Sequence, residues 1–245
     1  HPTALPTVYS GSIKLDLHRR DFTINTLAVQ LSPSSLMGHI LDFYNGLHDL
    51  ERKTIRVLHS LSFIDDPTRI LRAVRFEQRL NFHIEPRTEE LITTALPVLQ
   101  RITGERLRNE LTLLLKEPEP AQGLLKLARR DILTNIHPDF ILPNNIAALF
   151  DAIPAAIDQP LIDTPTPPDS TDLMWHLVFS AIHPESLPSV CERLLFSKPL
   201  TNAYVHANRL LHTPDEHMTQ PDSRPSQIVN TLHAVPLTAL ITVLI

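Results

Sequence analysis

The fold of this 245-residue chain is indicated most clearly by one stretch, Asp65-Asp66-Pro67-Thr68-Arg69-Ile70-Leu71-Arg72-Ala73-Val74-Arg75-Phe76. Aspartate followed by proline is a common helix start, with the aspartate at the N-cap and the proline at the first helical position. Ile70, Leu71 and Val74 then recur at helical spacing, which indicates one buried face. The stretch therefore predicts a helix that begins near Asp66.

Asp66 and Arg69 lie three residues apart and so share one face in the first turn of that helix. A carboxylate only accepts hydrogen bonds and a guanidinium only donates them, so the pair fits a ligand edge that offers one donor beside one acceptor. Cytosine and adenine present that edge, whereas uracil and guanine present a carbonyl oxygen and a protonated ring nitrogen. Each polar group left unpaired by a mismatch costs about 1–3 kcal/mol. The pair therefore predicts a reader that admits C and A.

A simpler interpretation stays open at this point. Asp66 alone is also what a helix cap looks like, and the same helix is then a structural scaffold with a solvated basic face and a buried apolar face. The members of the two faces are Arg69, Arg72, Arg75 and Arg79 on one side, and Ile70, Leu71, Val74 and Leu80 on the other.

Three further segments accompany the stretch in a fixed order: Arg19-Arg20-Asp21-Phe22-Thr23-Ile24-Asn25, Asp42-Phe43-Tyr44-Asn45-Gly46-Leu47-His48-Asp49-Leu50 and Arg101-Ile102-Thr103-Gly104-Glu105-Arg106-Leu107-Arg108-Asn109-Glu110-Leu111. In order and spacing, the four segments resemble the motifs of the class II tRNA nucleotidyltransferase and bacterial poly(A) polymerase family. We refer to them as the ribose motif (residues 19–25), the hinge motif (42–50), the template helix (65–76) and the support motif (101–111).

The resemblance implies roles for single residues. Asp21 is implied to bind the 2′-hydroxyl of the incoming nucleotide, with Arg20 and Asn25 on the ribose and phosphate side. Asp66 and Arg69 match the carboxylate and arginine that pair with the base. Residues implied to form the hinge or to support the template are Asp42, Gly46, Asp49, Arg72, Glu105 and Arg106.

The resemblance also implies an activity. The parent protein is expected to add C and A, or A alone, to the 3′ end of tRNA from CTP and ATP, without a nucleic-acid template. The terminal hydroxyl of the RNA would attack the α-phosphate, with pyrophosphate leaving. The alternatives are a poly(A) polymerase of the same family and a non-catalytic nucleotide- or RNA-binding module.

The sequence departs from the family pattern in two places. Asp65 stands where the family usually has glutamate. The glycine-rich Gly-Gly-x-Val-Arg-Asp segment and the Asp-x-Asp pair that open the family pattern do not occur in this sequence. Two-metal transfer needs carboxylates that bridge ions about 3.5–4 Å apart. We therefore expect no catalytic or metal-binding residue in this chain, with Mg²⁺ held by residues upstream.

Both ends of the chain suggest a piece of a larger enzyme. The sequence begins at His1 with Leu5-Pro6-Thr7-Val8 close behind, and residues 235–245 end inside an apolar pattern. We expect an internal fragment whose last residues are helical.

Composition and charge agree with a globular protein that meets RNA through a local patch. The chain is 42% hydrophobic and 20% charged, which supports a core. Its net charge is −5, but residues 1–117 hold 15 Lys and Arg against 14 Asp and Glu, and the remainder holds 7 against 13. The single cysteine, Cys191, excludes an intrachain disulfide and is expected to pack in the core. No apolar run reaches membrane-spanning length, so we predict a cytoplasmic protein with no membrane partner.

The predicted fold class is a predominantly α-helical neck and body with a small α+β remnant of a nucleotidyltransferase head. Strands are predicted at Gly38–Phe43 and Thr54–Leu58, and helix breaks at the prolines 86, 97, 118, 120 and 138. The predicted domains are the head remnant (1–60), the neck with the nucleotide-selecting helix (61–137) and the RNA-binding body (138–245). Leu107, Leu111, Leu114 and Leu115 are predicted core residues, and Pro160–Ser170 a linker.

Overall fold

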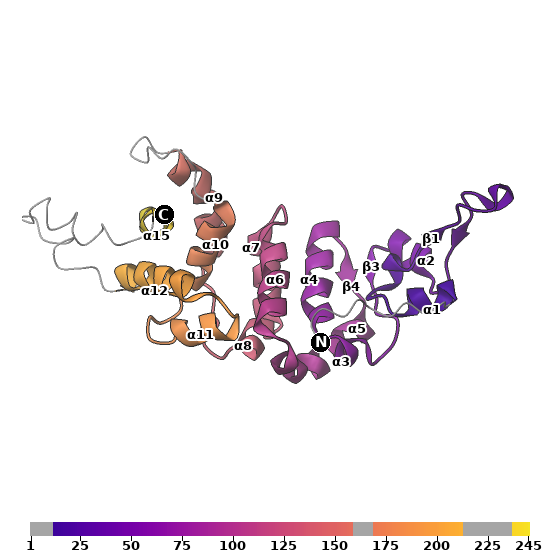
Figure 1. Ribbon diagram of the computed structural model, residues 1–245, viewed down its shortest axis with the longest axis horizontal. Coiled ribbons are helices and arrows are strands. Elements are labelled where there is room, and N and C mark those ends of the chain that lie inside the picture. Colours follow the sequence, from indigo (N-terminus) through magenta and orange to yellow (C-terminus); the bar gives the residue numbers. More distant parts are fainter. Residues whose placement is uncertain (1–11, 159–168, 213–236) are drawn as a thin grey trace, which may run out of the picture. The chain divides into compact units, whose positions relative to one another are not determined.

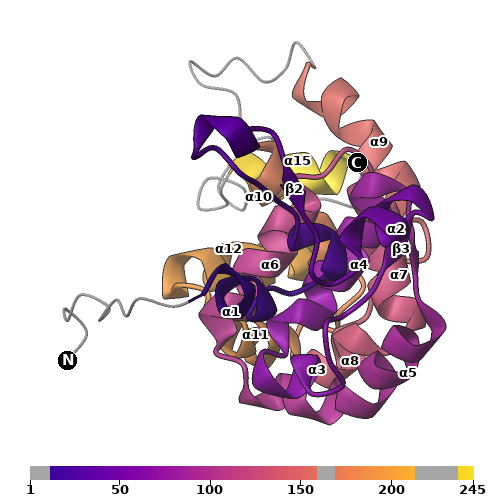
Figure 2. The ribbon, with the colours of Figure 1, turned by 90° about the vertical axis from the view of Figure 1, so that its right-hand side faces the viewer.

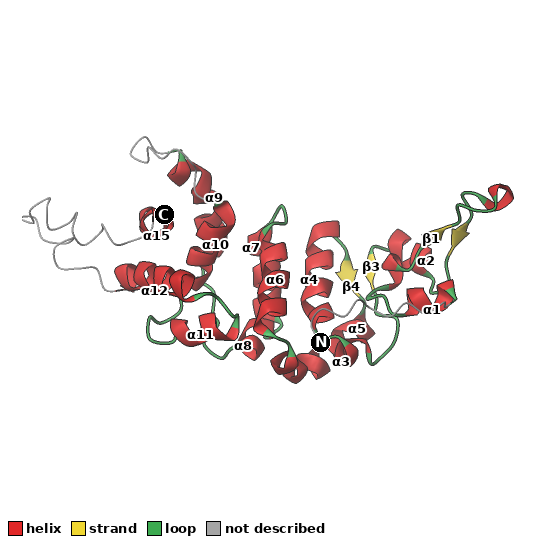
Figure 3. Ribbon diagram, in the orientation of Figure 1, coloured by secondary structure: helices red, strands yellow, loops and turns green. Residues whose placement is uncertain are grey.

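The computed structural model describes residues 12–158, 169–212 and 237–245, and the chain divides into two compact units, His1–Thr94 and Ala95–Ile245 (Figure 1). Helices make up most of the described part of each unit, and the four described strands are all in the first (Figure 3). The predicted fold class, a helical chain with a small α+β portion near its start, is confirmed. The three-part division at residues 60 and 137 stays a prediction.

The first unit has two small pairs of strands. β1 and β2 are antiparallel, with Ala28 opposite Leu41, and β3 and β4 are parallel, with Thr54 opposite His83. The predicted strands exist but each is only two residues long. The elements are α1 (Ile13–His18), η1 (Thr23–Asn25), β1 (Ala28–Val29), η2 (Ser34–Leu36), β2 (Ile40–Leu41), α2 (Gly46–Glu51), β3 (Thr54–Ile55), α3 (Ser62–Asp65), α4 (Thr68–Leu80), β4 (His83–Ile84) and α5 (Pro86–Ala95), which ends at the boundary of the units.

The template helix forms α4 and supplies much of the core of this unit. Ile70, Leu71 and Val74 are buried, as the sequence predicts. Leu80 is 37% exposed, so its predicted burial is wrong. It is the last residue of the helix, and Asn81 turns the chain away in the left-handed region at φ 52°. Phe22 of the ribose motif is buried and meets Phe76 edge to face, with ring centroids 5.7 Å apart.

The described elements of the second unit are all helices, joined by loops and turns. α10 packs against α9, α12 and α15 (Figure 2). The α-helix α5 ends at Ala95, as the predicted break at Pro97 requires, and the proline lies in the first turn of the 3₁₀ helix that follows, where its missing N–H is not needed. The elements are η3 (Leu96–Arg101), α6 (Gly104–Leu115), α7 (Pro120–Arg129), α8 (Ile132–Ile136), α9 (Ile146–Ile157), α10 (Ser170–Phe179), α11 (Leu187–Arg193), α12 (Lys198–His212) and α15 (Leu237–Leu244).

Leucines and aromatic rings form the core of the second unit. Leu107, Leu111, Leu114 and Leu115 are all buried, which confirms their prediction. Four aromatic rings form one connected group, in which Phe179 and Phe196 contact each other and both contact Trp175 and Tyr204. Cys191 is also buried, as predicted, and burial raises the pKa of its thiol to about 12. The segments 5–8 and 160–168, for which expectations were given, lie outside the described residues.

Among residues 12–158, 169–212 and 237–245, no helix is both long and apolar enough to cross a bilayer.

Candidate functional site

The ribose motif and the template helix meet at Asp21. Its Oδ2 accepts hydrogen bonds from Nε and Nη2 of Arg72, at 2.8 and 2.5 Å. Its Oδ1 accepts from the Phe22 N–H at 3.0 Å and from Nδ2 of Asn25 at 2.9 Å. The structure therefore brings three of the predicted residues, Asp21, Asn25 and Arg72, into one hydrogen-bonded cluster.

Asp21 is charged in this cluster despite its burial. It is 8% exposed. Burial on its own raises the pKa of Asp21, but the hydrogen bonds from Asn25, Arg72 and the Phe22 N–H outweigh burial, and the pKa lies below its ordinary value of 3.8. At neutral pH the side chain is therefore a carboxylate that accepts hydrogen bonds and cannot donate one.

Asp66 and Arg69 lie half-buried at the start of α4, and each is held by a neighbouring protein group. Oδ1 of Asp66 accepts from the N–H and the hydroxyl of Thr68, at 3.2 and 2.7 Å. Nη1 of Arg69 donates to the Ser62 hydroxyl at 2.7 Å, and its Nη2 donates to the Arg19 carbonyl at 2.7 Å. Asp66 thus caps the helix, as the simpler interpretation predicts, and Arg69 ties the helix to the ribose motif.

A solvated face formed by all four arginines of α4 is wrong. Arg72 is paired with Asp21, and Arg75 is 9% exposed. Both guanidinium carbons lie near the Phe76 ring, 5.4 and 5.6 Å from its centroid. Of the four, Arg79 is exposed. Because Arg69 and Arg72 lie about one turn apart and both reach residues 19–21, this face of α4 is an internal contact.

Arg20 stands apart from the Asp21 cluster in the described contacts. Its side chain is more than half exposed, and its Nη2 lies 3.7 Å from Oδ2 of Asp16. Asp16 also pairs with Arg19. The predicted role of Arg20 beside the ribose and phosphate therefore stays a prediction.

The hinge motif packs directly on the ribose motif. Buried Asp49 accepts from the Thr23 hydroxyl at 2.7 Å and from Nε of Arg56 at 3.0 Å. A Cβ at Gly46 would lie 2.4 Å from the Thr23 carbonyl oxygen, so only glycine fits this contact. Asp42 accepts from the backbone N–H groups of residue 44, just before α2, and of residues 46 and 47 in its first turn. Burial raises the pKa of Asp42, but these N–H groups outweigh it and lower the pKa overall.

Glu105 and Arg106 belong to the second unit, where both are exposed in the first turn of α6. The Arg106 N–H is 3.5 Å from the hydroxyl of Thr103, the N-cap. Gly104 beside them contacts the end of α11, because a Cβ there would lie 2.4 Å from the Arg193 carbonyl oxygen. The structure thus places Glu105 and Arg106 in the first turn of a helix that is capped by Thr103. Their predicted support of the template stays a prediction.

Sequence reasoning missed several residues that hold the site together. Arg56 joins Asp49 to Glu85, with Nη1 of Arg56 3.2 Å from Oε1 of Glu85. Ser62 and Thr68 hold the two side chains of the template. Their positions inside or next to the motifs were the available signal, but a hydroxyl gives no indication in sequence of which partner it binds.

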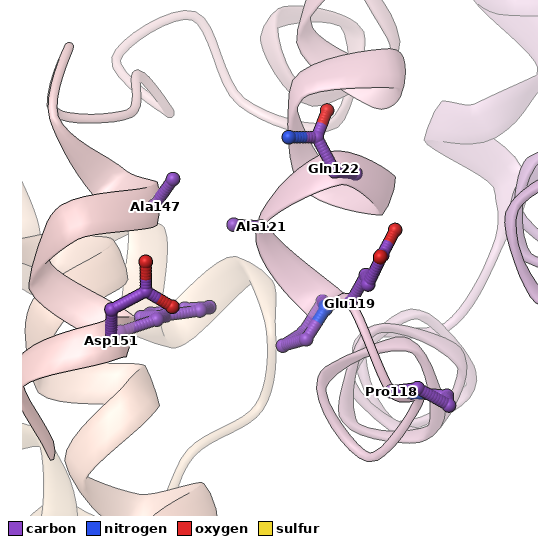
Figure 4. Close-up of a pocket in the computed structure, with 8 residues that line it drawn as sticks. Pro118, Glu119, Ala121, Gln122, Ala147 and Asp151 are labelled. Atoms are coloured by element: carbon purple, nitrogen blue, oxygen red, sulfur yellow. The ribbon is translucent and has the colours of Figure 1, made fainter. Parts of the chain in front are cut away.

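A cavity of about 320 Å³ lies elsewhere, between the start of α7 and α9 in the second unit (Figure 4). Glu119 and Gln122 line it from one side, and Ala147 and Asp151 from the other. Its lining includes two exposed carboxylates but neither lysine nor arginine. Phosphate groups are bound by cationic and N–H donors, so this cavity does not suit a nucleoside triphosphate.

Two family models and a curated relative match parts of this chain. A model of the "Poly A polymerase head domain" matches residues 3–56, and one of the "Probable RNA and SrmB- binding site of polymerase A" matches residues 81–141. The A-adding tRNA nucleotidyltransferase of Geobacter sulfurreducens is 49% identical over 158 residues, which are 64% of this chain and 18% of that protein.

Solved structures extend the likeness over nearly the whole chain. The Thermotoga maritima CCA-adding enzyme complexed with tRNA superposes with a TM-score of 0.75 at 34% identity, covering 95% of this chain and 56% of that one. A CCA-adding enzyme complexed with ATP gives a TM-score of 0.76 at the same identity and the same coverage. The chain thus spans little more than half the length of these neighbours. The motifs, the fold and these relatives together support the assignment of this chain to the class II tRNA nucleotidyltransferase family.

Proposed function

We propose that the full-length protein adds C and A, or A alone, to the 3′ end of tRNA from CTP and ATP, and that this chain selects the nucleotide. The observation that carries the proposal is the direct bonding of the ribose motif to the template helix, through Arg72 to Asp21 and through Arg69 to the Arg19 carbonyl. Base and sugar would be read by neighbouring parts of one unit. The names of the relatives, which are A-adding and CCA-adding enzymes, support this choice of reaction.

Asp21 is proposed to accept the 2′-hydroxyl of the incoming nucleotide. A carboxylate offers about four lone-pair positions, and four protein donors already point at Asp21. Two of those donors come from one guanidinium, that of Arg72. A ribose hydroxyl would therefore replace one of the Arg72 bonds while the other keeps the carboxylate charged and oriented. Arg20 and Asn25 are proposed to support the ribose and phosphate side.

Asp66 and Arg69 are proposed to read the base. The Asp66 carboxylate would accept from the exocyclic amino group of C or A, and the Arg69 guanidinium would donate to the adjacent ring nitrogen. Both side chains are half-buried, so a U or G edge would leave the acceptor and donor positions that face the base unsatisfied in a partly desolvated place. The hinge and support residues, including Asp42, Asp49 and Glu105, are proposed to hold or move this reader.

The transfer itself is proposed to need residues that this sequence does not contain. The 3′ hydroxyl of the RNA would attack the α-phosphate, and pyrophosphate would leave. The described residues offer no group of three or more carboxylate, histidine or cysteine side chains placed to hold a metal ion. We propose that Mg²⁺ is bound by carboxylates outside this chain and that the chain alone is inactive. We also propose that the protein is cytoplasmic. Residues 1–60 are proposed to belong to the head, residues 61–137 to form the neck and residues 138–245 to form the RNA-binding body.

An incorporation assay on the full-length protein tests the function. The substrates are tRNA ending before CCA, after the first C and after CC, each with one of the four triphosphates. Addition of C and A indicates a CCA-adding enzyme, and A only onto the CC end indicates an A-adding enzyme. Long A tails would indicate poly(A) polymerase, which the head-domain match also permits. No incorporation at all would contradict the proposal and favour a binding module.

Substitution of the reader tests the assignment of residues. Asp66→Ala and Arg69→Ala should lower selection of C and A over U and G, because each removes one half of the complementary edge. Arg87→Ala is the matched control, since Arg87 is exposed on α5 and pairs there only with Glu90 among the contacts described. Wild-type selectivity in both variants would contradict the assignment of Asp66 and Arg69 as base readers, although the proposed reaction would still stand.

A further inference from the structure

Two hydroxyl groups hold the proposed base-reading side chains. The Ser62 hydroxyl, at 0% exposure of its residue, accepts from Nη1 of Arg69 at 2.7 Å. The Thr68 hydroxyl, whose residue is 3% exposed, donates to Oδ1 of Asp66 at 2.7 Å. The Ser62 carbonyl also accepts the backbone N–H of Asp66 at 3.2 Å. Both readers are therefore fastened to one short segment, residues 62–69.

Fixed position matters more for selecting a base than for binding one. A guanidinium that rotates freely can donate to the carbonyl oxygen of U or G as readily as to the ring nitrogen of C or A. A carboxylate that moves can turn away from that carbonyl oxygen and accept a hydrogen bond from the protonated ring nitrogen beside it. Rejection of the wrong base needs the donor and the acceptor held side by side at one spacing, so that a mismatch leaves both unpaired. Hydrogen bonds from buried groups supply that constraint.

We propose that Ser62 and Thr68 are positioning residues that set base selectivity by fixing Arg69 and Asp66. The inference rests on the proposed function and adds two residues to its site. Neither hydroxyl needs to touch the nucleotide. Each acts through the side chain it holds.

A purely structural role for the two hydroxyls predicts a different result. Ser62 lies in the short helix α3, and the Thr68 N–H is bonded by the Asp66 cap, so both also contribute to the start of α4. Loss of structure alone would weaken the use of all four triphosphates by the same factor. Loss of positioning would lower the preference of ATP over GTP and of CTP over UTP.

The test uses Ser62→Ala and Thr68→Val in the full-length protein, because each removes a hydroxyl with little change in volume. Thr68→Ser keeps the hydroxyl and serves as the rescue variant. The controls are Ser189→Ala and Thr93→Val, whose hydroxyls bond the carbonyls of Ser186 and Glu89 within exposed helical turns. The quantity measured is kcat/KM for each triphosphate on tRNA ending before CCA and after CC.

The expected result is a fall of about tenfold in the ATP/GTP ratio, and in the CTP/UTP ratio where C is added, for both hydroxyl-deleting variants. Thr68→Ser and the controls should keep wild-type ratios. Unchanged ratios in Ser62→Ala and Thr68→Val, or an equal loss for all four triphosphates, would overturn the inference while the wild-type activity stands. If circular dichroism shows Ser62→Ala unfolded, Thr68→Val decides. A wild-type protein that incorporates nothing would overturn the proposed function and this inference with it.

Discussion

Asp21 receives hydrogen bonds from a backbone N–H, an amide and a guanidinium, and each bond fixes a different part of the first unit. The Phe22 N–H orients the ribose motif, Asn25 belongs to η1, and Arg72 comes from α4. A buried carboxylate with these partners stabilises the fold only while it is charged and only while the guanidinium is present. Arg72 is therefore as important to the site as the carboxylate itself.

Removal of Arg72 should affect stability and sugar choice together. We expect Arg72→Met to lower the free energy of unfolding by about 1–3 kcal/mol, less than for a fully buried pair because Arg72 is about one third exposed. The ratio of ATP to dATP incorporation should also fall, since Asp21 loses its orientation. Urea denaturation and incorporation assays on the full-length protein measure the two effects. Arg87→Met, at an exposed pair, is the control, and equal effects of both variants would contradict the role of Arg72.

At the scale of single residues, motif resemblance predicted Asp21, Asn25 and Arg72, and the structure brings these three together. It did not predict Ser62 or Arg56, which bind Arg69 and Asp49. For a charged residue in a motif, the type of partner can be predicted, because only an opposite charge or a strong hydrogen-bonding group suits a buried charge. A serine or a surface-type arginine has many possible partners in sequence, and only the packing of α3 and β3 selects one.

The helix α6 begins against the end of α11. The Arg193 guanidinium donates to the Leu99 and Ile102 carbonyls, at 2.9 and 3.1 Å, and Gly104 lies against the Arg193 carbonyl. Carbonyl groups before the helix are thus bonded from α11, and the glycine allows the two backbones to approach. The glycine of the support motif has a packing role at this contact.

Gly104→Ala should destabilise the second unit even though alanine favours helices. The added Cβ would lie 2.4 Å from a backbone oxygen, and overpacking of this kind costs about 1–3 kcal/mol. Asn109→Ala, at an exposed position of the same helix, should raise stability by a few tenths of a kcal/mol. Urea denaturation followed by circular dichroism measures both. Equal midpoints for Gly104→Ala and wild type would show that α11 moves away without cost.

The cap of α2 should depend on Asp42. Asp42→Ala removes the acceptor of three backbone N–H groups and should lower stability by about 1 kcal/mol, whereas Asp42→Asn keeps one oxygen and should lose less. Because the pKa of Asp42 is lowered in the folded state, its contribution is present above the ordinary value of 3.8 and is lost as pH falls below it. Urea denaturation at pH 7 and pH 3 checks both statements, and an equal difference between wild type and Asp42→Ala at the two pH values would contradict the second.

At the scale of elements, long periodic segments were predicted well and short ones poorly. The template helix and the leucine face of α6 follow from spacing alone, because three or more turns repeat the pattern. β1 and β4, two residues each, are too short to show alternation. The pair Asn45-Gly46 is typical of a turn and does not indicate the helix α2. Asn45 does adopt the left-handed conformation, at φ 62°, but a helix follows it.

The two units carry different acid-sensitive groups. In the first unit the pKa values of Asp21, Asp42 and Glu85 are lowered. In the second, burial lowers the pKa of His176 from 6.5 to about 4, although nearby Asp172 opposes the shift. His176 is 3% exposed, and its ring centroid lies 4.6 Å from that of Tyr204. The folded state therefore holds this histidine neutral.

Acid should loosen the second unit before the first. A histidine whose pKa is lower in the folded state than in the unfolded state makes the folded state less stable as pH falls from about 6.5 to 4. The free energy of unfolding falls by roughly 3 kcal/mol at most. The carboxylates of the first unit lose their contribution only below their ordinary values, near pH 4. Hydrogen exchange at pH 7 and 5, corrected for intrinsic rates, should show faster exchange in α10 and α12 but not in α2 and α4.

The variant His176→Phe keeps an aromatic ring beside Tyr204 and removes the titrating group. It should abolish the difference between pH 7 and pH 5 in α10. If the wild-type difference persists in this variant, another group is responsible for it.

For the whole molecule, composition and periodicity indicated a helical chain with a small mixed portion, and this was correct. The boundary of the compact units at residue 94 was not visible, because it falls at the end of the continuous helix α5 and no linker composition marks it. Boundaries that follow flexible linkers can be found in sequence, whereas a boundary at a helix end needs the contacts.

Arg69 has a consequence for protein engineering. Among the described residues its guanidinium bonds Ser62 of α3 and the Arg19 carbonyl, and these contacts occupy at most three of its five N–H groups, so that within this part of the chain at least two are available for a nucleotide edge. Lysine has three donors on one rotating ammonium and cannot span these directions at once. A redesign of nucleotide preference that replaces Arg69 alone would remove the proposed base reader. It would also remove the hydrogen bonds by which Arg69 joins α3 to the chain at residue 19. A new specificity at this position would have to be introduced with replacement partners for α3 and for the chain at residue 19.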